Sequence, residues 1–194
     1  MPDDPTIVLL AAGRATRMRG ADKMLEKIDG VPLLRLMSIR AAKAGATRVV
    51  LAEGQTDRRA LLSDLDIDLV EAPTGAGMAA SIVAGIAGLD GPVLITLADM
   101  PEITANDLYL LLGLSRQAPK AILRAATPDG TPGHPVLFPR HLLPKLAKLE
   151  GDQGARDILK AEVASVHLVP LADDRATVDL DTPEAWAAWR ARRP

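Results

Sequence analysis

The chain alternates short apolar runs with longer stretches in which apolar residues recur every three or four positions. Residues 6–11 form a nearly continuous apolar run, which is the pattern of a parallel strand buried on both faces of a sheet. Residues 31–44 have helical spacing instead, with Pro32 near the first turn and Gly45 as the stop. The two periods, one following the other, predict an α/β protein.

The same alternation continues almost to the end of the chain. Strands are predicted at residues 6–11, 47–52, 67–71, 91–97, 121–126, 135–138, 163–169 and 176–180. Helices are predicted at residues 31–44, 57–65, 77–89, 104–115, 140–149 and 153–162, with a final helix capped by Thr182. We expect one domain over residues 1–194, with a mostly parallel, doubly wound sheet. Its ligand should then bind beyond the carboxyl ends of the strands.

Composition narrows the range of functions. The chain has 23 basic and 25 acidic residues, a balance that does not favour binding to nucleic acid. It has no cysteine, which excludes disulfides, thiol nucleophiles and Cys-ligated zinc. No apolar run approaches the ~20 residues of a membrane span, and no basic-then-apolar leader is present, so we expect a cytoplasmic protein without a membrane partner.

A glycine-containing, basic loop follows the first predicted strand. Its cations are Arg14, Arg17, Arg19 and Lys23. They suit phosphate, because arginine donates to it bidentately and lysine acts as a point charge. The spacing matches neither GxxxxGK[ST] nor GxGxxG, which disfavours a Walker A loop and a dinucleotide-binding fold. The alternative is a solvated turn whose basic residues only keep it soluble.

An aspartate stands at the carboxyl end of the predicted strand 91–97. Asp99 is followed two residues later by Pro101, which prevents the strand from continuing. Asp99 either caps the following turn or holds a cation, and carboxylate oxygen is a ligand that suits Mg²⁺.

Two further aspartates alternate near the end of the chain. If residues 176–180 form a strand, Asp179 and Asp181 face the same side of the sheet. Two carboxylates on one side repel each other unless a cation or donor lies between them. We keep Asp179 as a second candidate metal ligand, and interpret Asp181 as a solvated acid or one that assists the cap of the last helix.

Three other segments have unusual residues for their place. Small residues open the predicted helix at Gly77, which could admit a flat ligand or serve tight helix–sheet packing. His134 lies between a turn and a short strand, where a packed structural histidine is the more common case. Arg156 opposes the helix dipole in a first helical turn, which suggests a nearby anion.

Taken together, these segments resemble the molybdenum cofactor nucleotidyltransferases, which are MobA-like NTP transferases. The matching pieces stand in family order and are Leu10-Ala11-Ala12-Gly13, Arg17-Met18, Lys23, Gly30-Val31-Pro32-Leu33-Leu34, Gly77-Met78, Ser81, Leu97-Ala98-Asp99-Met100-Pro101, Gly133-His134-Pro135-Val136, Gly151-Asp152-Gln153-Gly154-Ala155-Arg156 and Val178-Asp179-Leu180-Asp181-Thr182-Pro183-Glu184. Ala11-Ala12-Gly13 is more similar to the cytidylyltransferase branch, because the guanylyltransferase branch tends toward Ala-Gly-Gly. Arg14-Ala15-Thr16 departs from the family's more usual Gly- or Ser-containing tripeptide.

The resemblance implies a Rossmann-like nucleotidyltransferase fold, Mg²⁺ as cofactor and a nucleoside triphosphate as substrate. It implies that the nucleotide is bound by Leu10, Ala11, Ala12, Gly13, Arg14, Arg17, Lys23, Gly77, Met78, Ser81 and Asp99. Among these, Arg17, Lys23 and Asp99 would be catalytic, and Asp99 would share the metal with Asp179. The acceptor would be bound by His134, Pro135, Asp152 and Arg156.

The implied reaction is attack by a terminal phosphate of molybdopterin on the α-phosphorus of CTP, with release of pyrophosphate. Three alternatives stay open: guanylyl transfer from GTP to the same cofactor, nucleotidyl transfer to a sugar or alcohol phosphate, and a non-catalytic protein that handles the cofactor. A molybdoenzyme would be a further partner in any version that involves molybdopterin.

Overall fold

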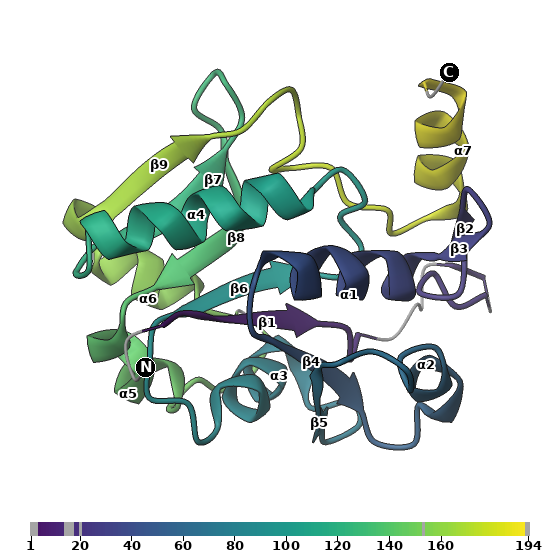
Figure 1. Ribbon diagram of the computed structural model, residues 1–194, viewed down its shortest axis with the longest axis horizontal. Helices are drawn as coiled ribbons and strands as arrows, with labels where there is room; N and C mark the ends of the chain where they lie inside the picture. The colour runs from purple at the N-terminus through teal and green to yellow at the C-terminus, as the bar shows by residue number, and fades with distance from the viewer. Residues whose placement is uncertain (1–3, 14–17, 20, 153, 193–194) are drawn as a thin grey trace.

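A seven-stranded sheet forms the centre of the protein in a computed structural model that describes residues 4–13, 18–19, 21–152 and 154–192 (Figure 1). The strand order is β5-β4-β1-β6-β8-β7-β9. The strands are β1 (Thr6–Leu10), β4 (Thr47–Ala52), β5 (Asp68–Ala72), β6 (Val93–Leu97), β7 (Ile122–Ala126), β8 (Pro132–Phe138) and β9 (Val166–Pro170). Only the pairs that include β8 are antiparallel among the described strands of this sheet. The predicted α/β fold with a mostly parallel, doubly wound sheet is confirmed.

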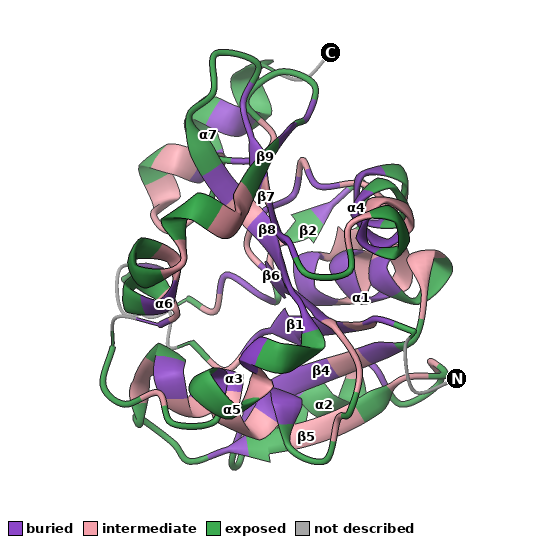
Figure 2. Ribbon diagram, turned by 90° about the vertical axis from the view of Figure 1, so that its left-hand side faces the viewer, coloured by how far each residue is buried: buried purple, intermediate pink, exposed green. Residues whose placement is uncertain are grey.

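Helices cover both faces of the sheet (Figure 2). One face packs against α1 (Leu33–Ala44) and α4 (Ala105–Gln117), and the other against α3 (Gly77–Ile86), α5 (Leu143–Leu146) and α6 (Arg156–Ala161). The remaining helical elements are α2 (Thr56–Ala60), α7 (Pro183–Arg192) and the 3₁₀ turns η2 (Arg140–Leu142) and η3 (Val163–Ser165). Residues 7–10 of β1 are all apolar because both faces of the strand are buried. Ile7 and Leu9 pack into one core, and Val8 and Leu10 pack into the other.

Several predictions of secondary structure need correction. Residues 163–165 of the predicted strand 163–169 are the 3₁₀ turn η3, and the predicted helix 57–65 ends at Ala60. Residues 176–180 are turns and irregular backbone rather than a strand, although they lie beside the sheet through isolated backbone hydrogen bonds. The predicted helix at residues 140–149 is only the turn η2 followed by the single-turn α5, because Pro144 lacks the backbone N–H that a continuous helix from residue 140 needs. A small hairpin, β2 (Lys27–Ile28) with β3 (Val31–Pro32), was not predicted.

The order of the strands fixes where a ligand can bind. The chain builds β4 and β5 on one side of β1 and then crosses to β6 on the other side. Leu10 and Leu97 are paired at the carboxyl ends of β1 and β6, and Ala98 N–H donates to the Leu10 carbonyl at 3.1 Å. This is the topological switch point at which doubly wound folds bind ligands. None of the described helices has the length and hydrophobicity that a bilayer crossing requires.

Candidate functional site

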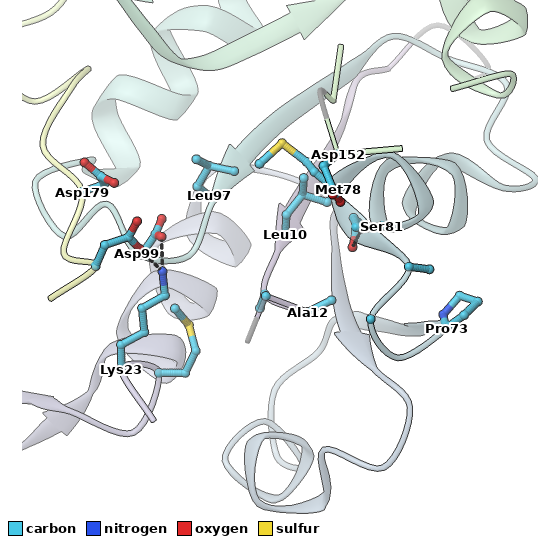
Figure 3. A pocket seen from close by; sticks show the side chains of 17 residues that line it. Leu10, Ala12, Lys23, Pro73, Met78, Ser81, Leu97, Asp99, Asp152 and Asp179 are labelled. Carbon is cyan, nitrogen blue, oxygen red and sulfur yellow. Dashed lines mark hydrogen bonds and ion pairs between the residues drawn. The ribbon is translucent and has the colours of Figure 1, made fainter. Parts of the chain in front are cut away.

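A cavity of about 500 Å³ opens at the carboxyl ends of β1 and β6 (Figure 3). It is lined by every candidate nucleotide-binding residue that the structure describes, namely Leu10, Ala11, Ala12, Gly13, Lys23, Gly77, Met78, Ser81 and Asp99. Arg14 and Arg17 lie outside the described residues. The loop after β1, the start of α3 and the end of β6 therefore meet around one space, as the motifs predicted.

Lys23 lies between two carboxylates on one side of this cavity. Its Nζ donates to Asp99 Oδ2 at 2.5 Å and also to Asp181 Oδ1, and only 11% of the side chain is exposed. Burial lowers the pKa of Lys23, but the charge of Asp99 and the hydrogen bonds to Asp181 and Asp99 outweigh it, so the pKa lies above its usual value. The ammonium is therefore charged at neutral pH.

Three carboxylates converge around this lysine. Oxygens of Asp99, Asp179 and Asp181 all lie within 4.8 Å of one another. Burial, together with the charges of Asp181 and Asp99, raises the pKa of Asp179. Asp99 Oδ1 is buried and has no hydrogen-bond partner among the described residues. An orphaned oxygen in a crowded set of hard oxygen ligands fits a divalent cation such as Mg²⁺.

The place of Asp181 corrects the sequence interpretation. Asp181 is neither simply solvated nor a cap of the last helix, because it accepts from Lys23, while Thr182 Oγ1 caps α7 by accepting from Ala185 N–H at 3.1 Å. Asp179 and Asp181 do face the same side, but they belong to an irregular segment and not to a strand. Leu180 N–H, between them, donates to the Asp99 carbonyl at 3.0 Å and thereby brings all three acids together.

A glycine in β8 lets that irregular segment approach the sheet. A Cβ on Gly133 would lie 1.8 Å from the Ala176 carbonyl oxygen, and the next residue, His134, donates its N–H to that same oxygen at 2.8 Å. Any side chain at residue 133 would therefore displace the segment that carries Asp179 and Asp181.

The opposite wall of the cavity is built by α3 and the turn at Gly151 and Asp152. Gly77 has φ +81°, and a Cβ there would lie 2.0 Å from Asp152 Oδ1, so the turn packs directly on the start of the helix. Ala79 N–H donates to the Gly151 carbonyl at 3.3 Å. Further along α3, Gly85 is close to Val8 and Val50. The small residues of this helix thus serve the cavity at its start and tight helix–sheet packing further on.

A second cavity, of about 810 Å³, adjoins the first. Leu10, Met78 and Asp152 line both cavities. Of the candidate acceptor-binding residues, His134, Asp152 and Arg156 line the second cavity. Pro135 does not line it, because its ring is buried within β8.

Arg124 on β7 gives the second cavity a cationic wall that sequence reasoning missed. Its Nε donates to the Gly133 carbonyl at 3.1 Å, and burial lowers its pKa. Burial and the charge of Arg124 lower the pKa of His134 to about 4, against the opposing influence of Asp99 and a backbone hydrogen bond with Ile95. His134 is therefore neutral at physiological pH. The available signal was a single arginine inside an otherwise apolar strand.

Comparison with known proteins agrees with this fold. The family model "MobA-like NTP transferase domain" matches residues 7–167. The chain is 28% identical over 204 residues to the purine catabolism protein PucB of Bacillus subtilis (strain 168), covering 92% of each chain. It is 27% identical over 200 residues to the molybdenum cofactor guanylyltransferase of Serratia proteamaculans (strain 568), covering 100% of this chain and 98% of the relative.

Among solved structures, Rv0371c of Mycobacterium tuberculosis H37Rv in complex with manganese has the same fold. The TM-score is 0.82 at 23% identity, with 98% of this chain and 100% of the other covered. Fold and family together define the chain as a nucleotidyltransferase. It belongs to the MobA-like NTP transferase family.

Proposed function

We propose that this chain transfers CMP from CTP to a terminal phosphate of molybdopterin in a Mg²⁺-dependent reaction that releases pyrophosphate. The observation that carries the proposal is the shared cleft, in which Lys23 from the loop after β1 meets the carboxylates Asp99, Asp179 and Asp181. The molybdenum cofactor guanylyltransferase relative supports the acceptor.

Asp99, Asp179 and Asp181 would hold the divalent ion. When bound, the ion supplies positive charge to the triphosphate and to the pyrophosphate that leaves. Each carboxylate offers oxygen, and the unpartnered Asp99 Oδ1 is available without breaking a hydrogen bond to another described residue. The manganese complex of Rv0371c, which shares the fold, is consistent with a divalent ion at such a site.

Lys23 would change partners when the nucleotide binds. Without nucleotide its ammonium neutralises part of the charge of Asp99 and Asp181. With nucleotide, it would donate to phosphate oxygens as negative charge builds up on the leaving pyrophosphate. Its raised pKa keeps it protonated for this role.

The transfer itself needs little acid–base chemistry. An oxygen of the acceptor phosphate forms a bond to the α-phosphorus, and the bond from that phosphorus to the α,β-bridging oxygen breaks, leaving pyrophosphate. A phosphate monoester is already anionic, so alignment and charge neutralisation are the main demands on the protein. The second cavity, with Arg124, His134 and Arg156 on its walls, would hold the acceptor beside the triphosphate.

GTP is the second candidate nucleotide. The loop sequence Ala11-Ala12-Gly13 supports CTP, because the guanylyl branch of the family tends toward a second glycine. The relative from Serratia proteamaculans is, however, named as a guanylyltransferase.

A pyrophosphate-release assay with each of the four nucleoside triphosphates, with and without molybdopterin, tests the proposal. We expect release with CTP only when both molybdopterin and Mg²⁺ are present. Release of pyrophosphate with GTP and with no other nucleotide would show that GTP, not CTP, is the substrate. Release with a sugar phosphate but not with molybdopterin would show that the acceptor is a sugar phosphate. Nucleotide binding without any release would leave the non-catalytic alternative.

A further inference from the structure

We propose that Arg58 is a positioning residue that clasps the two ends of the nucleotide-binding loop and so sets the place of Lys23. This inference rests on the proposed function, in which Lys23 donates to the triphosphate in the cavity that residues 10–13 also line. Arg58 belongs to α2, outside every motif of the family resemblance, and does not line either cavity.

The guanidinium of Arg58 is buried and makes four hydrogen bonds. Only 3% of the residue is exposed. Nε and Nη2 donate to Asp22 Oδ2 and Oδ1, both at 2.7 Å, in a bidentate ion pair. Nη1 donates to the Ala11 carbonyl, and Nη2 to the Gly13 carbonyl at 3.1 Å. One side chain therefore joins the start of the loop to its end.

The clasp extends to the backbone on the far side of Lys23. Asp22 Oδ1 also accepts from Met24 N–H at 3.0 Å, and the Asp22 carbonyl accepts from Leu25 N–H at 2.9 Å. Lys23 lies between Asp22 and Met24, which these hydrogen bonds hold in place. From this position its Nζ donates to Asp99 Oδ2. A planar five-donor group is suited to this task, because it satisfies a carboxylate and two carbonyls at once in a fixed geometry.

Two carbonyls at Ala11 and Gly13 that turn toward Arg58 also leave the cavity less negative. A carbonyl oxygen that accepts from a buried guanidinium cannot point at a triphosphate, which it would repel. These two hydrogen bonds thus direct the carbonyl oxygens of Ala11 and Gly13 toward Arg58 rather than toward an anion in the cavity.

The chain contains a matched control at the opposite end of the sheet. Arg48 on β4 donates to one carboxylate, Asp68 at 2.6 Å, and to two carbonyls, Gly85 at 3.1 Å and Ala87 at 2.6 Å. Its bonding pattern is close to that of Arg58, but neither cavity is lined by these residues. Losing Arg48 should therefore reduce stability without changing nucleotide binding.

The test compares Arg58→Met, Arg58→Lys, Asp22→Asn and Arg48→Met with the wild-type chain. CTP affinity is measured calorimetrically with Mg²⁺ and no acceptor, and KM and kcat for CTP are measured with molybdopterin. We expect Arg58→Met to weaken CTP binding on the order of 10–100-fold, as small misplacements of binding groups do, with Asp22→Asn changing it in the same direction. Arg58→Lys should restore part of the loss, and Arg48→Met should stay within about twofold of wild type.

Each outcome decides the point. If folded Arg58→Met binds CTP as wild type does, or if Arg48→Met weakens CTP binding as much, Arg58 is a general structural residue. Should Arg58→Met fail to fold, normal CTP binding by Arg58→Lys and Asp22→Asn would overturn the clasp. If the wild-type chain binds no nucleoside triphosphate, both the proposed function and this inference are wrong. If wild type binds CTP and the variants bind it equally well, only the inference is wrong.

Discussion

Lys23 joins two otherwise separate parts of the site. It comes from the loop after the first strand, yet its ammonium contacts one acid from the turn that follows β6 and another from the segment before α7. Without it, three carboxylates whose oxygens lie within 4.8 Å of one another would lack their nearest cation among the described residues. The residue therefore offsets the repulsion among these carboxylates, and in the proposed reaction it would also donate to the substrate.

Replacing Lys23 by Met is expected to lower turnover by roughly 10²–10³, the scale of losing one charge partner of a transition state. The effect should fall on kcat, measured by pyrophosphate release at saturating CTP and molybdopterin. Lys27→Met is the matched control, because Lys27 is an exposed lysine of the β2–β3 hairpin that lines neither cavity.

The same variant should bind Mn²⁺ more tightly than wild type when no nucleotide is present. The ammonium of Lys23 competes with a divalent ion for Asp99 and Asp181, so its removal frees both carboxylates. Turnover like that of wild type would remove Lys23 from the mechanism, and weaker Mn²⁺ binding would show that lysine and metal do not compete.

His134 should make the protein less stable in mild acid. Its pKa of about 4 in the fold lies below the usual value of 6.5, so the unfolded chain binds the proton more readily. The contribution is present above pH 6.5, declines as the pH falls toward 4, and amounts to at most about 3 kcal/mol. Urea unfolding of wild type and His134→Gln from pH 4 to 7.5 measures it.

The His134→Gln variant should lose this part of the pH dependence while keeping the rest. Parallel stability profiles for the two proteins over this range would mean that His134 titrates normally. The burial and the neighbouring Arg124 would then not control its charge.

Residues beside strand ends were predictable, and residues brought in from a distance were not. Lys23 and Asp99 follow apolar runs whose ends meet at one edge of a parallel sheet, so the sequence places both near the ligand. The role of Asp181 depends on a single backbone hydrogen bond, from Leu180 to Asp99, that no local pattern indicates. Arg58 and Arg124 likewise act through contacts with residues that lie elsewhere in the sequence, and neither arginine belongs to a motif of its own.

At the level of elements, the segment at residues 171–181 is the part that differs most from expectation. Its alternation of apolar and acidic residues is that of a half-buried strand, and residues 176–180 were predicted as one. The observed segment instead makes isolated hydrogen bonds without a continuous ladder: the Ala176 carbonyl accepts from His134 N–H, and Leu180 N–H donates to the Asp99 carbonyl. Alternation of apolar and acidic residues indicates which side chains are buried. An irregular segment that packs against the sheet buries alternate side chains as a strand does, so the pattern does not distinguish the two.

The strands of the sheet were predicted well for the same physical reason. The apolar centres of these runs, such as residues 49–52 and 93–95, are buried, as is typical of short apolar segments in a sheet that is covered on both faces. The hairpin of β2 and β3 was missed because strands of two residues carry no periodicity.

Gly133→Ala should disturb the segment that carries two of the acids. An added methyl group meets the Ala176 carbonyl, which must move, and overpacking of this kind costs about 1–3 kcal/mol. Mn²⁺ affinity should fall together with the free energy of unfolding, measured by calorimetric titration and by urea denaturation.

Gly113→Ala provides the comparison for that glycine. Gly113 lies within α4, where no heavy atom approaches the added methyl group within 4 Å, so alanine should stabilise the protein by about 0.5–1 kcal/mol. A Gly133→Ala protein with unchanged Mn²⁺ affinity would show that the approach of Ala176 does not position Asp179 and Asp181.

For the whole molecule, the topology explains why two cavities lie side by side. The switch between β1 and β6 opens the first cavity, and the antiparallel β8, carrying His134, extends the same surface into the second. In the proposed reaction, the nucleotide and the acceptor of its nucleotidyl group would then lie in adjacent cavities. The one-domain organisation and the cytoplasmic location expected from sequence stay predictions.

The dependence of pyrophosphate release on Mg²⁺ concentration, compared between wild type and Asp99→Asn, tests the central claim most directly. We expect the wild-type activity to rise with Mg²⁺ concentration to a plateau. The folded Asp99→Asn variant should be about 100-fold or more less active than wild type at every Mg²⁺ concentration. An Asp99→Asn protein with the same Mg²⁺ midpoint and the same plateau as wild type would contradict the account.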